Sequence, residues 1–282
     1  SLVSAAVAYA EYGEFKRAEE YLLEGLDLCM IHHGEDEFIT RATMSKLAIL
    51  LSDNGDFERA LKYLEQGLEI SKRVDADESE LNIWKGRVAS MLMMVGRADE
   101  AVVNLKQVLA YNQKTLGNNH PETLAEMNNL GGAYYKSDDF ETAAIWFGAA
   151  LEGSESVFGK GHLRTLTQKM NLALSLKNLG EMERALEMFY ESLEIRLREN
   201  GPDDPGTTYV QKNISTLLRD MGRIDEALPY SRAAFEAQRR FAGIDHEYTL
   251  AHLDNLAGNL RELEKFEEAS KFIVSAGTSN NN

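Results

Sequence analysis

Residues 47–60 read LAILLSDNGDFERA, and this stretch decides the fold. Leu47 and Leu51 stand one helical turn apart, so the segment predicts a helix with one apolar face. Gly55 ends that helix, because glycine accepts the left-handed backbone that a tight C-cap requires. Ala60 lies on the helix that follows, where its small side chain lets two helix axes approach closely. The stretch therefore predicts a helix, a short turn and a second helix.

The same pattern recurs along the chain with a period of 42 residues. The intervals between equivalent alanines are 42, except for one of 41, and the alanines are Ala18, Ala60, Ala101, Ala143, Ala185, Ala227 and Ala269. A self-similar period of this length is typical of stacked helical repeats. The predicted fold class is therefore all-α, a right-handed α-solenoid of seven antiparallel helix pairs.

We expect one repeat array over residues 1–276 and a disordered tail over residues 277–282. The expected repeats span approximately residues 1–34, 35–75, 76–117, 118–159, 160–201, 202–243 and 244–276. Because the chain opens in a helical pattern without a methionine, we also expect it to be a segment of a longer protein. Another α-solenoid of similar period, such as HEAT, is the alternative fold, but the glycine turns and the recurring small residues argue against it.

Two kinds of turn position recur as well. Five repeats have glycine five residues before the alanine, whereas Asp138 and Glu264 stand there in the other two. The connections between repeats carry polar residues that we interpret as helix caps, and these are His120, His162, Asp204 and His246.

The composition is acidic, with 30 Lys and Arg against 46 Asp and Glu and a formal net charge of −16. Such a surface is repelled by phosphate, so nucleic acid and anionic membranes are poor partners. The single Cys29 cannot form an internal disulfide, which favours a cytoplasmic location. No run of about 18 apolar residues is present, so we expect no membrane insertion.

No catalytic motif stands out, and we expect a protein that is not an enzyme and needs no cofactor. The histidines and Cys29 lack the spacing of a zinc site, so we expect no metal site. Gly131 and Gly132 lie within a predicted helix rather than in a phosphate-binding loop.

The pattern of small residue, aromatic residue and alanine resembles that of tetratricopeptide repeats, whose usual period is 34. The longer form found here, with about one more turn per helix, resembles the repeats of kinesin light chains and related signalling proteins. The likeness is carried by residues 116–124, LGNNHPETL, and by the following Asn128, Asn129, Leu130 and Gly131. The resemblance implies asparagine-lined grooves that receive short cargo motifs combining acidic residues with a tryptophan.

Helical rotation places three positions of each first helix on the face opposite the core, where a concave groove is expected. In the later repeats this face carries asparagines, which hydrogen-bond to a peptide backbone, and cations, which select carboxylates. The candidate peptide-binding residues are Asn129, Asn171, Asn213, Asn255, Tyr135, Lys177, Lys212, Arg219 and Arg261. Tyr135, Met170 and Leu174 lie on the same predicted face, where they are expected either to form an apolar anchor pocket or only to fill gaps in the packing. The alternative is structural: asparagines that link neighbouring helices, and cations that interact with the helix dipole.

The leading hypothesis is a scaffold or adaptor that binds a linear, acidic peptide in the groove of the later repeats. A second hypothesis makes the array a sensory or autoinhibitory domain of a larger signalling protein, such as a nucleotide-switch ATPase. A third treats the array as an assembly spacer.

Overall fold

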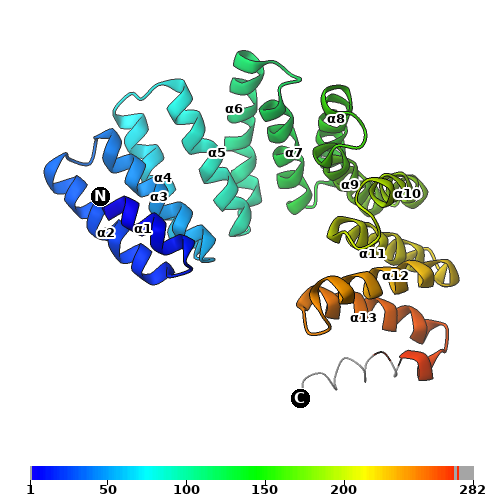
Figure 1. Ribbon diagram of the computed structural model, residues 1–282. Coiled ribbons are helices and arrows are strands. Elements are labelled where there is room, and N and C mark those ends of the chain that lie inside the picture. Colours follow the sequence, from blue (N-terminus) through cyan, green and yellow to red (C-terminus); the bar gives the residue numbers. More distant parts are fainter. Residues whose placement is uncertain (1, 270–271, 273–282) are drawn as a thin grey trace. The chain divides into compact units, whose positions relative to one another are not determined.

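The computed structural model describes residues 2–269 and residue 272. These residues contain no strand and form the following helices (Figure 1): α1 (Leu2–Glu11), α2 (Phe15–His32), α3 (Phe38–Asp53), α4 (Phe57–Arg73), α5 (Glu78–Met94), α6 (Ala98–Leu116), α7 (Pro121–Lys136), α8 (Phe140–Phe158), α9 (Leu163–Asn178), α10 (Met182–Glu199), α11 (Pro205–Asp220), α12 (Ile224–Ala242) and α13 (Glu247–Glu262). Residues 266–269 are also helical. The predicted tail, residues 277–282, lies outside the described residues, and the repeat boundaries stay predictions.

The helices group into two compact units. The N-terminal unit, Ser1–Asp139, contains α1 to α7, and the C-terminal unit, Phe140–Asn282, contains α8 to α13. Within each unit an odd-numbered helix packs against its even-numbered neighbours, and in the C-terminal unit α11 also contacts α13. The surface formed by the odd-numbered helices of a unit is called its odd-helix face below.

The residues that define the repeat form the core. Leu47, Leu51 and Ala60 are at most 1% exposed, so the two helices of this hairpin meet along the apolar stripe predicted from the sequence. In the C-terminal unit, Phe189 of α10 and Ile214 of α11 are fully buried in one hydrophobic cluster, to which α9 and α12 also contribute residues. Burial of apolar surface of this kind is the main stabilising contribution in stacked repeats.

The hairpin turns share one hydrogen-bonded geometry. Gly55 has φ +82°, its N–H donates to the backbone of α3, and the N–H of Asp56 donates to the carbonyl of Leu51 at 2.8 Å. This is the Schellman arrangement, which satisfies the last carbonyl groups of a helix. Asp138 and Glu264 keep the same turn with φ +59° and +58° although they carry a Cβ. The geometry is thus set by the repeat, and two residues adopt it under strain.

The capping role predicted for the loop histidines is confirmed. The Nδ1 atoms of His120, His162 and His246 accept hydrogen bonds from the backbone N–H two residues further on, at 3.3, 3.2 and 3.3 Å. The carboxylate of Asp204 accepts from the N–H of Thr207 at 2.8 Å. These side chains satisfy N–H groups that a helix N-terminus leaves without a partner.

Two contacts join neighbouring repeats of the N-terminal unit. Trp84 of α5 is 4% exposed and lies directly over Gly67 of α4, where an added Cβ would come within 2.3 Å of the indole ring. The guanidinium of Arg41, which is almost completely buried, donates to both carboxylate oxygens of Glu80 at 2.8 and 3.2 Å. This hydrogen-bonded cation holds the pKa of Glu80 below its usual value.

Candidate functional site

Three of the predicted cations, Lys177, Arg219 and Arg261, form a basic row on the odd-helix face of the C-terminal unit, but the first two have acidic partners. Lys177 Nζ on α9 lies 2.7 Å from an Asp220 oxygen on α11, and Arg219 Nε on α11 lies 3.9 Å from a Glu262 oxygen on α13. Each carboxylate stands 43 residues after its cation, which is one repeat period plus one residue. The row is therefore a ladder of ion pairs between neighbouring repeats.

The remaining cations are arranged differently. Arg261, at the end of α13, is exposed. Lys212 is half-buried on α11 beside His252 of α13, whose side chain is only 6% exposed. Burial, with a smaller contribution from the charge of Lys212, lowers the pKa of His252 to about 4. The neutral imidazole is thus the form that fits the folded chain.

Asn255 is a structural residue and does not project from the face, contrary to the sequence-based expectation. Its side chain is 8% exposed, its Oδ1 accepts from Ser215 Oγ at 2.9 Å, and its Nδ2 donates to Thr216 Oγ1 at 3.1 Å. The neighbouring Asn259 extends this buried network by donating to Ser215 and Ser231. The reason for the difference is that α13 packs closely on α11, which turns Asn255 into a link between two repeats.

The other predicted asparagines lie nearer the surface. Asn213 is half-buried and donates to the backbone carbonyl of Tyr209 at 2.8 Å, and Asn171 is also half-buried. Asn129, in the N-terminal unit, is exposed and donates to Glu126 Oε2 at 3.3 Å. Burial raises the pKa of Glu126, while this hydrogen bond acts in the opposite direction. Two of these amides therefore already bond to groups of their own helix.

The predicted apolar anchor is not assembled as expected. Met170 is buried in the core of the C-terminal unit, and Leu174 packs against that core from a half-buried position. Tyr135 is half-buried at the end of α7 in the N-terminal unit. Met170 therefore belongs to the packing between helices.

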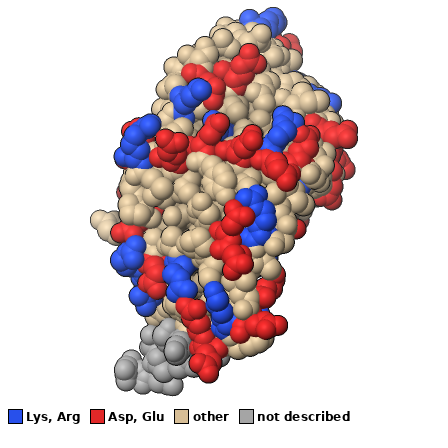
Figure 2. All heavy atoms as spheres, turned by 90° about the vertical axis from the view of Figure 1, so that its right-hand side faces the viewer, with Lys and Arg blue, Asp and Glu red and all other residues tan. Residues whose placement is uncertain are grey.

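Charges of both signs cover the surface. On the face shown in Figure 2, acidic side chains predominate and basic ones lie among them. Across residues 2–269, no cluster of three or more potential metal ligands among His, Cys, Asp and Glu is found. Over the same range, no helix is long and apolar enough to cross a bilayer.

The repeated hairpin, its Schellman turn and the 42-residue period agree with comparison to known families. The sequence matches a tetratricopeptide repeat family over residues 1–73, 79–156, 162–230 and 207–273. The chain belongs to the tetratricopeptide repeat family. Tetratricopeptide repeats are a scaffold fold that binds protein or peptide partners, so the chain is built for protein–protein interaction.

Solved structures with the same fold confirm the predicted class, a right-handed solenoid of helix pairs. Nearly identical tetratricopeptide-like repeats of a putative kinesin light chain from Podosopora anserina match at 23% identity with a TM-score of 0.64, covering 70% of this chain and 93% of that one. BtubC from P. vanneervenii matches at 20% identity with a TM-score of 0.63, covering 80% of this chain and 90% of that one.

A third structure is a signal transduction ATPase with a tetratricopeptide repeat sensor from Pyrococcus horikoshii. It matches at 16% identity with a TM-score of 0.72, covering 99% of this chain and 41% of that one. At these identities the likeness establishes the fold alone. The search of curated proteins finds no significant match.

Proposed function

We propose that this tetratricopeptide array is a scaffold or adaptor that binds a linear, acidic peptide on the odd-helix face of the C-terminal unit. The observation that carries the proposal is the row of Lys177, Arg219 and Arg261 in a chain whose formal net charge is −16. Asn171 and Asn213 lie on the same helices and supply amides for contact with a peptide backbone. The proposed partner is a protein and not nucleic acid, the proposed location is cytoplasmic, and no catalytic role is proposed.

The ion pairs of the row are compatible with this role. Lys177 and Arg219 keep about a quarter of their side-chain surface exposed, and their partners Asp220 and Glu262 keep 36% and 48%. Exposed pairs of this kind contribute about 0–1 kcal/mol. Breaking these pairs therefore costs the fold little, so the two cations are available to a peptide carboxylate.

The first test removes the cations. The triple variant Lys177→Gln, Arg219→Gln, Arg261→Gln is compared with the wild type for binding a labelled, glutamate-rich peptide by fluorescence anisotropy. We expect an affinity at least about tenfold lower, because three charged hydrogen bonds are lost. The matched control neutralises three exposed arginines on even-numbered helices of the same unit, namely Arg184, Arg198 and Arg239. Equal losses in both triple variants contradict the proposal, because only total charge then matters.

The second test removes the competing acids. The double variant Asp220→Asn, Glu262→Gln frees Lys177 and Arg219 from their internal ion pairs. Since each pair contributes up to about 1 kcal/mol, we expect the affinity for the same peptide to rise by up to about fivefold for each pair that is removed. The control, Glu183→Gln with Glu187→Gln, makes the same change in charge at exposed positions of α10. An affinity no higher than that of the control would show that the ladder does not take part in binding.

The alternative function is a sensory or autoinhibitory domain of a larger signalling protein. It is favoured by the likeness to the Pyrococcus horikoshii ATPase, whose sensor has tetratricopeptide repeats. The match covers 99% of the present chain and 41% of the ATPase. The gene that encodes this chain distinguishes the two functions. An adjoining nucleotide-binding ATPase domain supports the sensor, whereas its absence supports the scaffold.

A further inference from the structure

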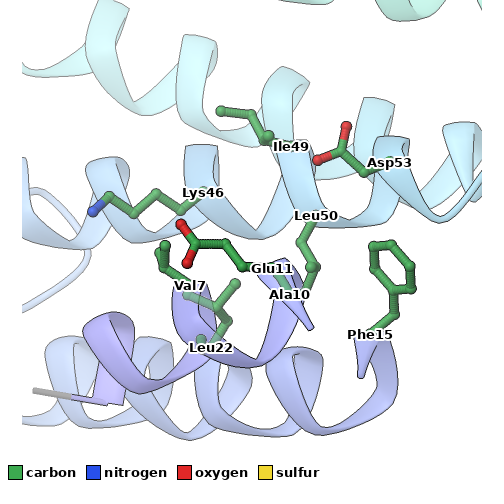
Figure 3. Close-up of a pocket in the computed structure, with 10 residues that line it drawn as sticks. Val7, Ala10, Glu11, Phe15, Leu22, Lys46, Ile49, Leu50 and Asp53 are labelled. Carbon is green, nitrogen blue, oxygen red and sulfur yellow. The ribbon is translucent and has the colours of Figure 1, made fainter. Parts of the chain in front are cut away.

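The odd-helix face of the N-terminal unit has an open apolar pocket, in contrast to the charged ladder of the C-terminal unit. The pocket lies between α1 and α3, with part of α2 behind it, and has a volume of about 570 Å³ (Figure 3). Its apolar lining includes Val7, Leu22 and Ile49, and Val7 and Ile49 are each almost half exposed. A concave apolar surface of this volume is of the size that accepts a side chain or small group of a ligand.

A single repeat position explains why the pocket is open. Eight residues before the repeat alanine, the C-terminal unit has Lys177 and Arg219, whereas the first repeat has Ala10. The guanidinium of Arg219 covers Gly258, so that a Cβ added there would lie 2.9 Å from its nitrogen. Gly258 occupies the repeat position that Val7 and Ile49 hold in the first two repeats. By the same spacing Ala10 corresponds to Ile49 of the next repeat, and its short side chain leaves Ile49 uncovered.

The same difference leaves the carboxylate of Asp53 available at the pocket, where Glu11 also lies. Glu11 and Asp53 line it and are exposed. They stand at the repeat position of Asp220 and Glu262, which hold Lys177 and Arg219. Across the described part of the chain, no Lys or Arg forms an ion pair with Glu11 or Asp53. Ala10 stands 43 residues before Asp53, where the ladder would require a cation.

Lys46 is the one cation among the pocket residues. Figure 3 shows its side chain extending away from Asp53, toward the other end of the pocket. The end of the pocket near Asp53 therefore combines apolar surface with uncompensated negative charge.

We propose that this pocket binds a partner protein through a large apolar side chain flanked by lysine or arginine. The apolar side chain fills the space beside Val7 and Ile49, and the neighbouring cation takes the place beside Asp53 that Lys177 takes beside Asp220. The partner segment is thus basic and amphipathic, opposite in charge to the acidic peptide proposed for the C-terminal unit. The inference goes beyond the proposed function and rests on different residues.

The test uses a variant that the C-terminal unit itself suggests. Ala10→Arg places a guanidinium where it pairs with Asp53 and covers the pocket, and Ala110→Arg makes the same substitution at an exposed position of α6 in the same unit. Binding is measured by fluorescence anisotropy with a short labelled peptide that has a central leucine flanked by lysines. Two further peptides replace the leucine by glycine or the lysines by glutamates.

We expect the leucine–lysine peptide to bind the wild type and the Ala110→Arg variant at least about tenfold more tightly than either altered peptide. Ala10→Arg removes this preference, and thermal unfolding shows whether it remains folded. If that variant fails to fold, Asp53→Asn takes its place and is expected to weaken binding of the leucine–lysine peptide but not of the peptide in which glutamates replace the lysines.

The inference would be overturned if the glycine peptide bound the wild type as tightly as the leucine–lysine peptide does, because the lysines would then bind to the acidic surface in general. Unchanged binding by Ala10→Arg relative to Ala110→Arg would overturn it too. The proposed function is tested separately, with the glutamate-rich peptide and variants of the C-terminal unit. Failure of one proposal is therefore distinguishable from failure of the other.

Discussion

The substitution of glycine by alanine at two equivalent positions of the array is expected to have opposite effects on stability. Gly25 and Gly67 each stand seven residues after a repeat alanine, inside α2 and α4. Alanine is favoured over glycine within a helix by about 1 kcal/mol, so the substitution stabilises wherever there is room for a methyl group. At Gly25 the nearest atoms to an added Cβ are 3.7 and 3.8 Å away, which is ordinary contact.

At Gly67 the same methyl group would meet three atoms of the Trp84 ring, at 2.3, 2.4 and 2.9 Å. Trp84 is almost fully buried, so its ring has little room to retreat, and overpacking of this kind destabilises by about 1–3 kcal/mol. After the helix preference is subtracted, Gly67→Ala is expected to be destabilising by up to about 2 kcal/mol. Gly25→Ala is expected to stabilise by about 0.5–1 kcal/mol.

Chemical unfolding monitored by circular dichroism and by tryptophan fluorescence measures both effects. The double variant Gly67→Ala, Trp84→Leu provides the control, since the smaller side chain removes the clash. Stabilisation by Gly67→Ala, or an equal loss of stability in both single variants, would refute the packing argument.

Three further predictions follow from the described contacts. Asp138→Gly is expected to stabilise by about 1 kcal/mol in thermal unfolding, since φ +59° strains any residue with a Cβ; an unchanged melting temperature contradicts this. Glu80→Ala removes the carboxylate partner of the buried guanidinium of Arg41, which keeps its hydrogen bond to the carbonyl of Asp36, so a loss of about 3 kcal/mol is expected in urea unfolding; a loss below about 1 kcal/mol would show that water replaces the carboxylate. Between pH 6.5 and about 4 the unfolded chain binds a proton that buried His252 does not, so stability falls with decreasing pH by up to about 3 kcal/mol. His252→Gln removes that share of the acid sensitivity, and an identical pH profile of unfolding in the variant argues against it.

The sequence was sufficient to predict the hairpin because its determinants are local and repeat seven times. Leu47, Gly55 and Ala60 act within one hairpin, and comparison with the other repeats separates them from chance. The loop histidines were predictable for the same reason, since a cap acts on the helix that it precedes.

Contacts between repeats were harder to predict from the sequence. The position of Trp84 against Gly67 depends on which side chain of α5 faces α4, and helical periodicity fixes that direction only approximately. Asn255 was assigned to the open face for this reason, although its packing against α11 buries it. The ion-pair ladder does have a sequence signal, a cation followed by an acid one period plus one residue later.

That constant offset also bears on how the array can lengthen. Lys177 and Arg219 each hold a carboxylate of the next repeat, so α11 contributes the acid of one pair and the cation of the following pair. A tandem duplication of the segment from α11 to α12 would pair Arg219 with the duplicated Asp220, and the duplicated Arg219 with Glu262. The ion pairs of the ladder therefore allow repeats of this type to be added or removed as whole units, whereas the buried network of Asn255 and Asn259 is specific to the last repeat.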